Sequence, residues 1–276
     1  MISAVFVAAL FLAGCDCSVD VPHLAVTKSF SRALQDCMEY LQVPGYRYAE
    51  YAANSFPDDP ETKCLLRCVG LNLRWWNDTA GVQAAVMERF FQPDPLDVEY
   101  ENRTETCLQQ SLMSGDTSDS CNLAYESFMC YLQHYGNLVP CPQYHPEDES
   151  RDVRIARDCM NVLQVPEQML RAYRKGNFPD APETRCLLRC FFLRSGLYSV
   201  DTGFDVKRLY TRDFEQPDKR YLSPDTRTKL QELRASTGDQ CTEVYLAYRD
   251  VFGELGRPFV TGRVLKAAAA GLDSKF

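Results

Sequence analysis

Two runs of cysteines with nearly the same spacing constrain this chain more than any other feature of its sequence. The first run leaves gaps of 26, 3, 38, 13 and 8 residues, and consists of Cys37, Cys64, Cys68, Cys107, Cys121 and Cys130. The second run repeats the gaps of 26 and 3 residues and then keeps one further cysteine, and consists of Cys159, Cys186, Cys190 and Cys241. The chain is therefore expected to contain two copies of one disulfide-stabilised module, the second of which has lost a bridge.

The duplication extends beyond the cysteines into the segments around them. Residues 36–44 align with 158–166, and residues 56–68 align with 178–190, at a single offset of 122 residues. Fainter matches follow at nearly the same offset, at 78–79 with 201–202 (123 residues) and at 92–94 with 216–218 (124 residues). The repeat therefore spans a whole module, and each copy covers about 100 residues, which is a common domain length.

The limits of the two copies divide the chain into five expected segments. The apolar run 5–13 is too short to cross a bilayer and is followed by small and polar residues, which is typical of a secretory signal. The stretch after the first copy is rich in proline and acidic residues, as linkers are. The expected segments are a signal peptide (1–17), a first domain (18–134), a linker (135–152), a second domain (153–252) and a C-terminal tail (253–276).

The pattern of apolar residues predicts an all-α fold, because no alternating strand pattern of useful length occurs. The run Asp59-Pro60-Glu61 predicts the start of a helix, since Asp accepts an unpaired amide, Pro already has a helical φ and Glu favours the positive end of the helix dipole. That helix carries Cys64 and Cys68 one turn apart, so they can join it to two different neighbours. Further helices are expected at 28–43, 46–53, 81–91, 104–114 and 119–134.

The charge and the few histidines argue against several classes of function. A net charge of -8 and a pI near 5.0 disfavour nucleic acid and anionic membranes as partners, since both require a concentrated basic patch. The three histidines, His23, His134 and His145, lie outside the spacing of a zinc knuckle. No nucleophile, phosphate-binding or dinucleotide-binding motif is present. We therefore expect a protein that is not an enzyme, binds no cofactor, metal or nucleic acid, and does not insert into membranes.

Two further features bear on secretion. Asn77 and Asn102 each begin an Asn-x-Thr glycosylation acceptor, and both lie in the first copy. Removal of a signal ending near Cys17 would leave an odd number of cysteines, with Cys141 outside both runs. Cys141 is then free, or it pairs with a retained Cys17 or with another chain.

Aromatic residues make up 12% of the chain, and many fall on the faces of the expected helices. They are either ordinary core side chains or the walls of a dry cavity that the disulfides hold open. The candidate ligand contacts are Leu65, Val69, Trp75, Trp76, Phe90, Phe128 and Tyr131 in the first copy, and Leu187, Phe191, Leu197, Tyr210, Tyr245, Tyr248 and Phe252 in the second.

The gaps of the first cysteine run resemble the six-cysteine signature of insect odorant-binding proteins, in which the gaps of three and eight residues are the specific part. The resemblance covers both copies and implies a two-domain, atypical member of the mosquito type, with two tandem six-helix domains. It further implies bridges from the first cysteine to the third, the second to the fifth and the fourth to the sixth. These would be Cys37–Cys68, Cys64–Cys121 and Cys107–Cys130, followed by Cys159–Cys190 and Cys186–Cys241.

The second copy departs from that signature at the positions of the fourth and sixth cysteines, which by spacing are Arg227 and Asp250. We predict that these opposite charges form an ion pair across the same two helices. An exposed ion pair contributes ~1 kcal/mol or less, against ~3 kcal/mol for a disulfide.

The resemblance implies a secreted carrier that reversibly binds a small apolar ligand such as an odorant, and it allows an odorant receptor or a second copy of the chain as a further partner. The long-form D7 salivary proteins of mosquitoes, which sequester biogenic amines and lipid mediators, are similar too. However, Tyr48 and Tyr51 stand where their spaced tryptophans would be, and Leu65 stands in place of an aromatic residue. An odorant carrier is therefore favoured over a D7-like scavenger, with a protein-interaction module of collapsed cavities as another alternative.

The tail allows two interpretations. Its apolar residues could cover a pocket as a lid: Phe259, Val260, Val264, Leu265 and Leu272. Its glycines would equally suit a disordered tail.

Overall fold

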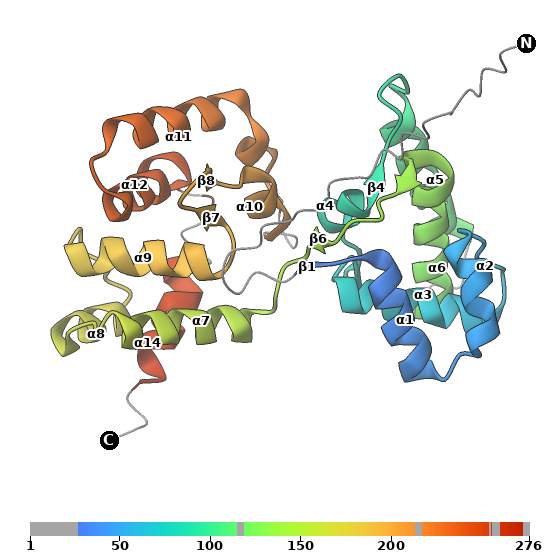
Figure 1. Ribbon diagram of the computed structural model, residues 1–276, viewed down its shortest axis with the longest axis horizontal. Coiled ribbons are helices and arrows are strands. Elements are labelled where there is room, and N and C mark those ends of the chain that lie inside the picture. The colour runs from blue at the N-terminus through green and yellow to red at the C-terminus, as the bar shows by residue number, and fades with distance from the viewer. Residues whose placement is uncertain (1–26, 115–118, 213–216, 254, 256–259, 273–276) are drawn as a thin grey trace, which may run out of the picture.

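The chain forms two lobes of helices joined by extended segments (Figure 1). The computed structural model describes residues 27–114, 119–212, 217–253, 255 and 260–272. In this part of the chain the fold is all-α, as predicted, and each sheet has only two short strands.

Each lobe corresponds to one copy of the repeat. The helical segments of the first copy are α1 (Phe30–Leu41), η1 (Gly45–Arg47), α2 (Tyr48–Ala52), α3 (Pro60–Leu73), α4 (Ala84–Met87), η2 (Glu88–Phe90), α5 (Tyr100–Ser114), α6 (Ser120–Cys130) and the π-helix η3 (Tyr131–Tyr135). Those of the second copy are α7 (Glu149–Val162), α8 (Glu167–Arg174), α9 (Pro182–Arg194), α10 (Val206–Arg212), η4 (Lys219–Leu222), α11 (Pro224–Ser236), α12 (Gln240–Leu246), the π-helices η5 (Ala247–Val251) and η6 (Val260–Leu265), and α14 (Lys266–Ala270).

The strands form four antiparallel pairs. These are β1 (Thr27–Lys28) with β6 (Gln143–Tyr144), β2 (Trp76–Asn77) with β3 (Gly81–Val82), β4 (Phe91–Gln92) with β5 (Asn137–Leu138), and β7 (Tyr198–Ser199) with β8 (Gly203–Phe204). The β2–β3 and β7–β8 hairpins occupy equivalent places in the two copies.

The central helix of each lobe begins as the sequence predicts. Asp59 caps α3, because its carboxylate accepts a hydrogen bond of 2.8 Å from the amide of Thr62, and Pro60 occupies the first turn. In the second copy α9 begins with Pro182 after Ala181, which provides no side-chain cap. The two helix starts therefore share a backbone path but differ in the cap.

All five bridges implied by the resemblance are present, and each lies within one copy. They are Cys37–Cys68, Cys64–Cys121, Cys107–Cys130, Cys159–Cys190 and Cys186–Cys241. Cys64 and Cys68 thus join α3 to α6 and α1 respectively, as their spacing predicts. Cys141 is also disulfide-bonded, so the free-thiol interpretation is wrong. Its partner lies outside the described residues.

The helix expected over 81–91 is the clearest error in the predicted elements. Gly81 has a φ of 76° and starts β3, which pairs back onto β2, and Phe91 lies in β4. Only α4 and the short η2 lie between them. The apolar residues that suggested a long helix instead lie in two strands, β3 and β4, and in the short helical segment between them.

The segment expected to be a linker is attached to the first copy. Its β5 and β6 pair with β4 and β1, and the amide of Val139 donates to the carbonyl of Phe90 at 2.9 Å. Its last residues already belong to α7, which begins at Glu149. This part of the chain therefore follows a defined path along the first lobe.

The described part of the tail belongs to the core of the second copy. Val260, Val264 and Leu265 are fully buried, and η6 and α14 contact α7 and α8. Leu272 is half-buried against the same core, whereas Phe259 lies outside the described residues. For residues 260–272 the disordered-tail interpretation is wrong, because these side chains complete the packing of the lobe.

The predicted ion pair between Arg227 and Asp250 is also wrong. Asp250 accepts hydrogen bonds of 2.6 and 2.7 Å from its neighbour Arg249, and within the described residues Arg227 forms no ion pair with it. Arg249 reaches the carboxylate without crossing between helices, so the local partner is favoured.

Candidate functional site

Seven of the predicted ligand contacts lie together in the core of the first copy. Phe128 is at its centre, with its ring centroid 5.2 Å from Phe30, 4.9 Å from Phe56, 6.1 Å from Trp75 and 5.8 Å from Phe91. The seven residues are at most 5% exposed: Leu65, Val69, Trp75, Trp76, Phe90, Phe128 and Tyr131. The predicted residues thus form one aromatic core.

The other seven form the corresponding core of the second copy. Leu187, Phe191, Leu197, Tyr245, Tyr248 and Phe252 are at most 8% exposed, and Tyr210 is half-buried at the edge of the cluster. Sequence reasoning missed Phe192, whose ring centroid lies 5.2 Å from Phe204 and 6.0 Å from Tyr248. It also missed Phe56, although Phe178 repeats it at the offset of 122 residues.

Gly70 permits the close packing of α3 in the first core. A Cβ atom at this position would lie 2.5 Å from the Cβ of Trp76 and 3.0 Å from the ring of Trp75. Only a residue without a side chain allows both tryptophans to lie against the helix.

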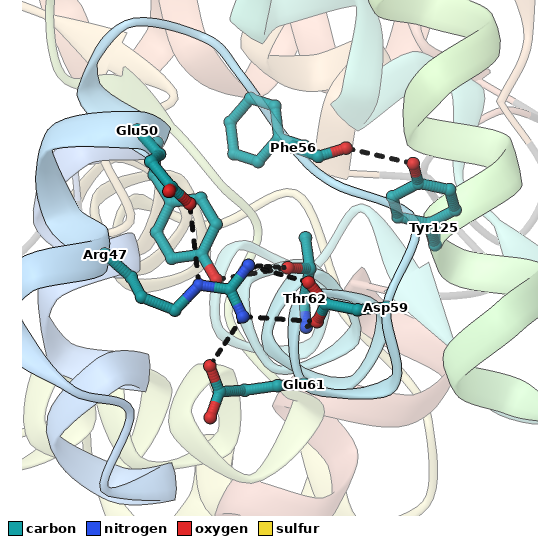
Figure 2. Close-up of polar contacts among 8 residues, drawn as sticks. Arg47, Glu50, Phe56, Asp59, Glu61, Thr62 and Tyr125 are labelled. Atoms are coloured by element: carbon teal, nitrogen blue, oxygen red, sulfur yellow. Dashed lines mark hydrogen bonds and ion pairs between the residues drawn. The ribbon is translucent and has the colours of Figure 1, made fainter.

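A polar cluster closes one end of the first core (Figure 2). The Arg47 guanidinium donates to Asp59 at 2.7 and 3.3 Å and to Glu61 at 2.8 Å. Because Arg47 hydrogen-bonds to it, the pKa of Asp59 is lowered to about 2. Thr62 lies between this cluster and the core, since its hydroxyl is 3.1 Å from the Oη of Tyr51.

The second copy keeps only the inner part of that cluster. The hydroxyls of Tyr173 and Thr184 lie 2.9 Å apart, and Tyr173 stacks on Phe178 at 4.9 Å. The positions of Arg47 and Asp59, however, are taken by Met169 and Ala181. The ion pair at the N-terminus of the central helix is therefore specific to the first copy.

Three pockets in the described part of the chain lie beside the two cores. In the second copy, a groove of about 540 Å³ follows the β7–β8 hairpin, and a cavity of about 210 Å³ lies between β8, α11 and η5. In the first copy, a hollow of about 370 Å³ lies between α1 and η1. None of the fourteen predicted contacts lines these three spaces, so the role of those contacts in binding stays a prediction.

The remaining predicted sites are on the surface. The side chains of Asn77, at the end of β2, and Asn102, on α5, are exposed, and their glycosylation stays a prediction. Among the described residues, no three His, Cys, Asp or Glu side chains are grouped to hold a metal ion. No helix in the described ranges is both long and apolar enough to span a membrane.

Comparison with known proteins assigns both lobes to one group. The PBP/GOBP family pattern matches residues 23–134 and again residues 143–242. General odorant-binding protein 69 of Anopheles gambiae is 32% identical over 188 residues, which cover 64% of this chain and 80% of that protein. General odorant-binding protein 99b of Drosophila melanogaster is 27% identical over 92 residues, covering 32% of this chain and 62% of that protein.

Solved structures match part of the chain. The Anopheles gambiae odorant-binding protein 22a with bound cyclohexanone is 32% identical and covers 37% of this chain and 88% of its own, with a TM-score of 0.31.

Proposed function

The chain belongs to the PBP/GOBP family of odorant-binding proteins in both of its copies, and from this premise we propose that it is a secreted carrier that reversibly binds small hydrophobic ligands in its helical domains. Membership of this family indicates a role as a carrier of small ligands. We propose in addition that the ligands are apolar, that binding is reversible and that the protein is secreted.

The two disulfide-framed aromatic cores support the proposal most directly. Each core is surrounded by helices that the bridges hold at fixed positions, so a binding site can persist in a small domain without further packing. Burial of ~300 Å² of ligand surface would contribute about 7 to 8 kcal/mol before ordering costs, which is consistent with micromolar dissociation constants.

Displacement of a fluorescent apolar probe from the full chain tests this function. N-phenyl-1-naphthylamine is expected to bind and to be displaced by apolar volatiles at micromolar concentration. Phe128→Leu, at the centre of the first core, is expected to alter the affinity severalfold. Tyr46→Ala is the control, since Tyr46 is 77% exposed.

Three outcomes separate the alternatives. Displacement by apolar ligands supports the carrier. Preferential binding of biogenic amines would instead indicate a scavenger similar to the D7 proteins. If nothing binds, the carrier proposal fails and a protein-interaction module takes its place. If separately expressed copies both bind, differing displacement profiles are expected, because their polar clusters and pockets differ.

A further inference from the structure

We propose that the cavity between β8, α11 and η5 of the second copy binds a small apolar molecule that carries one hydroxyl group. This inference rests on the carrier function proposed above and assigns it a site and a ligand class. The cavity has a volume of about 210 Å³. Phe204, Val206, Leu230 and Ala247 provide apolar walls, and three charged residues, Arg227, Arg234 and Glu243, also line the cavity. The proposal depends on the last two.

The two charged groups face each other without a direct hydrogen bond. Arg234 Nη1 lies 3.8 Å from Glu243 Oε1, which is longer than a hydrogen bond. Nη1 is buried and has no hydrogen-bond partner among the described residues. A buried donor of this kind is costly unless another polar atom meets it. Two residues that line the cavity therefore leave a donor without a hydrogen bond beside a carboxylate acceptor.

Neither side chain is free to close that gap. Arg234 Nη2 donates to the carbonyls of Val200 and Asp201 at 2.6 and 2.8 Å, which anchors the guanidinium to the β7–β8 turn. Glu243 is only 7% exposed, and its other oxygen accepts a hydrogen bond of 3.1 Å from the Oη of Tyr198. The spacing between the two groups is thus fixed by contacts outside the cavity.

Gly203 keeps the space beside this pair unfilled. Its φ of 80° lies in the left-handed region, where glycine is favoured, and a Cβ there would lie 3.1 Å from Arg234 Nη1 and 3.9 Å from Glu243 Oε1. A side chain at this position would crowd the two groups. At Gly203 the β7–β8 hairpin therefore places only backbone atoms next to Arg234 and Glu243.

A hydroxyl group has the chemistry that the pair requires. Its oxygen accepts a hydrogen bond from Nη1, and its proton is donated to the Glu243 carboxylate. An ether oxygen satisfies only the donor, and a hydrocarbon satisfies neither group. An organic cation would face the Arg234 charge. The apolar walls favour a hydrocarbon body, so an alcohol or phenol fits best.

The first copy does not have this arrangement. Its α5 and α6, which correspond to α11 and α12, are joined by Cys107–Cys130, with Cα atoms 5.7 Å apart. In the second copy Arg227, at the position corresponding to Cys107, lines the cavity. Leu123 stands two residues after Cys121, as Glu243 does after Cys241. The proposed site is therefore specific to the copy that has lost the bridge.

Calorimetric titration of the full chain with cyclohexanol and with methylcyclohexane, which has a similar shape, tests the site. Arg234→Met is expected to weaken cyclohexanol binding about tenfold or more, since a hydrogen bond to a charged group is lost. Methylcyclohexane binding is expected to change less than about twofold. Lys229→Met is the matched control: Lys229 lies on the same helix but pairs with Asp225 on its exposed face.

A second variant covers the case in which Arg234→Met fails to fold. Glu243→Gln keeps the side-chain volume and an acceptor for Tyr198. It is expected to reduce the preference for cyclohexanol over cyclohexyl methyl ether, which cannot donate. In amide NMR spectra of the parent chain, cyclohexanol is expected to shift Leu230 and Gln231.

Unchanged cyclohexanol affinity in a folded variant, or no shift at Leu230 and Gln231, overturns the site. If the apolar probe is still displaced from the chain in that case, the carrier function stands and only this site is rejected. If neither the probe nor cyclohexanol binds, both proposals fail.

Discussion

Arg89 of the first copy directs its Nη1 at the Oγ1 of Thr211 in the second, at 3.5 Å, and the two residues are 122 positions apart. That separation equals the main offset of the sequence repeat, so the two residues occupy nearly equivalent positions in their own copies. The lobes therefore meet through α4 and η2 on one side and the equivalent α10 on the other, as two subunits meet in an isologous dimer.

The Tyr144 ring lies between guanidinium groups from the two lobes. It is 4% exposed, with Arg89 Cζ 5.9 Å and Arg208 Cζ 5.5 Å from its centroid. Tyr144→Ala is expected to lower the free energy of unfolding by about 3 kcal/mol or more, because it removes a buried ring at the contact. Tyr144→Phe keeps the ring and is expected to leave the stability nearly unchanged.

The two tryptophans allow the unfolding of each lobe to be followed separately. Trp75 and Trp76 are the only two in the chain, so tryptophan fluorescence follows the first copy, whereas circular dichroism follows both. In denaturant, Tyr144→Ala is expected to separate the two transitions. Identical transitions in Tyr144→Ala and Tyr144→Phe would contradict the role of this ring.

The helix caps of α3 and α9 give a matched pair of substitutions. Asp59→Ala removes the acceptor for the amide of Thr62 and is expected to destabilise the first copy by about 1 kcal/mol. Ala181→Asp adds such an acceptor where the backbone has the same extended conformation, with φ near -133° against -134°. It is expected to stabilise the second copy by about the same amount. In the Tyr144→Ala background, where the two lobes are expected to unfold separately, the first substitution should move the tryptophan transition, and the second should leave it in place.

Because of Asp59, we also expect the first copy to lose stability at acidic pH. Its pKa falls to about 2 in the folded chain through the hydrogen bond from Arg47, against an ordinary value of 3.8. The stabilisation is present above the unfolded pKa and is lost as the pH falls from about 4 to about 2. Asp59→Asn keeps a capping oxygen without the charge, so its tryptophan-detected stability is expected to fall less over this window. Equal acid sensitivity in the two proteins would assign the effect to other groups.

For Glu88 we expect the opposite dependence of stability on pH. Burial raises its pKa from 4.5 to about 7, and the charge of Glu101 adds to the rise while Lys219 opposes it. A raised carboxyl pKa gives stability that is full below about 4.5 and is lost as the pH rises to about 7. Glu88→Gln is expected to flatten this part of the stability profile, and Glu101→Gln to change it less. A profile that Glu88→Gln leaves unaltered would contradict the assignment.

The sequence predicted the features that follow from the family's cysteine signature or from strong local rules. The bridge of Cys64 with Cys121, which the resemblance to odorant-binding proteins implied, the cap at Asp59 and the burial of Phe128 all agree with the structure. The cap and the burial succeed because a capping residue or an apolar helix face is a local signal, and the bridge succeeds because the family's pairing applies to this chain. The all-α class followed for the same reason.

The features that the sequence did not predict depend on residues far apart in the chain, or on a choice between neighbouring partners. The strands β1 and β6 have two residues each and pair across more than a hundred positions, so no local pattern marks them. Asp250 binds Arg249 rather than Arg227, a choice that spacing alone cannot make. The unfilled gap between Arg234 and Glu243 arises from how the β7–β8 turn anchors the guanidinium.

The C-terminal helix gives the most direct test of the second core. Leu265 is fully buried where η6 meets α14, and Arg174 Nε donates to the carbonyl of Ala269 at 3.2 Å. Leu265→Ala is expected to lower the free energy of unfolding of the second copy by about 2 to 5 kcal/mol, because it leaves a cavity in a packed core. Val162→Ala is the control, since Val162 is 69% exposed and its loss should change stability by less than about 0.5 kcal/mol. Both variants are measured in the Tyr144→Ala background, by the circular dichroism transition that tryptophan fluorescence does not follow. A Leu265→Ala value as small as that of Val162→Ala would mean that the C-terminal helix is dispensable to the core and acts only as a cover.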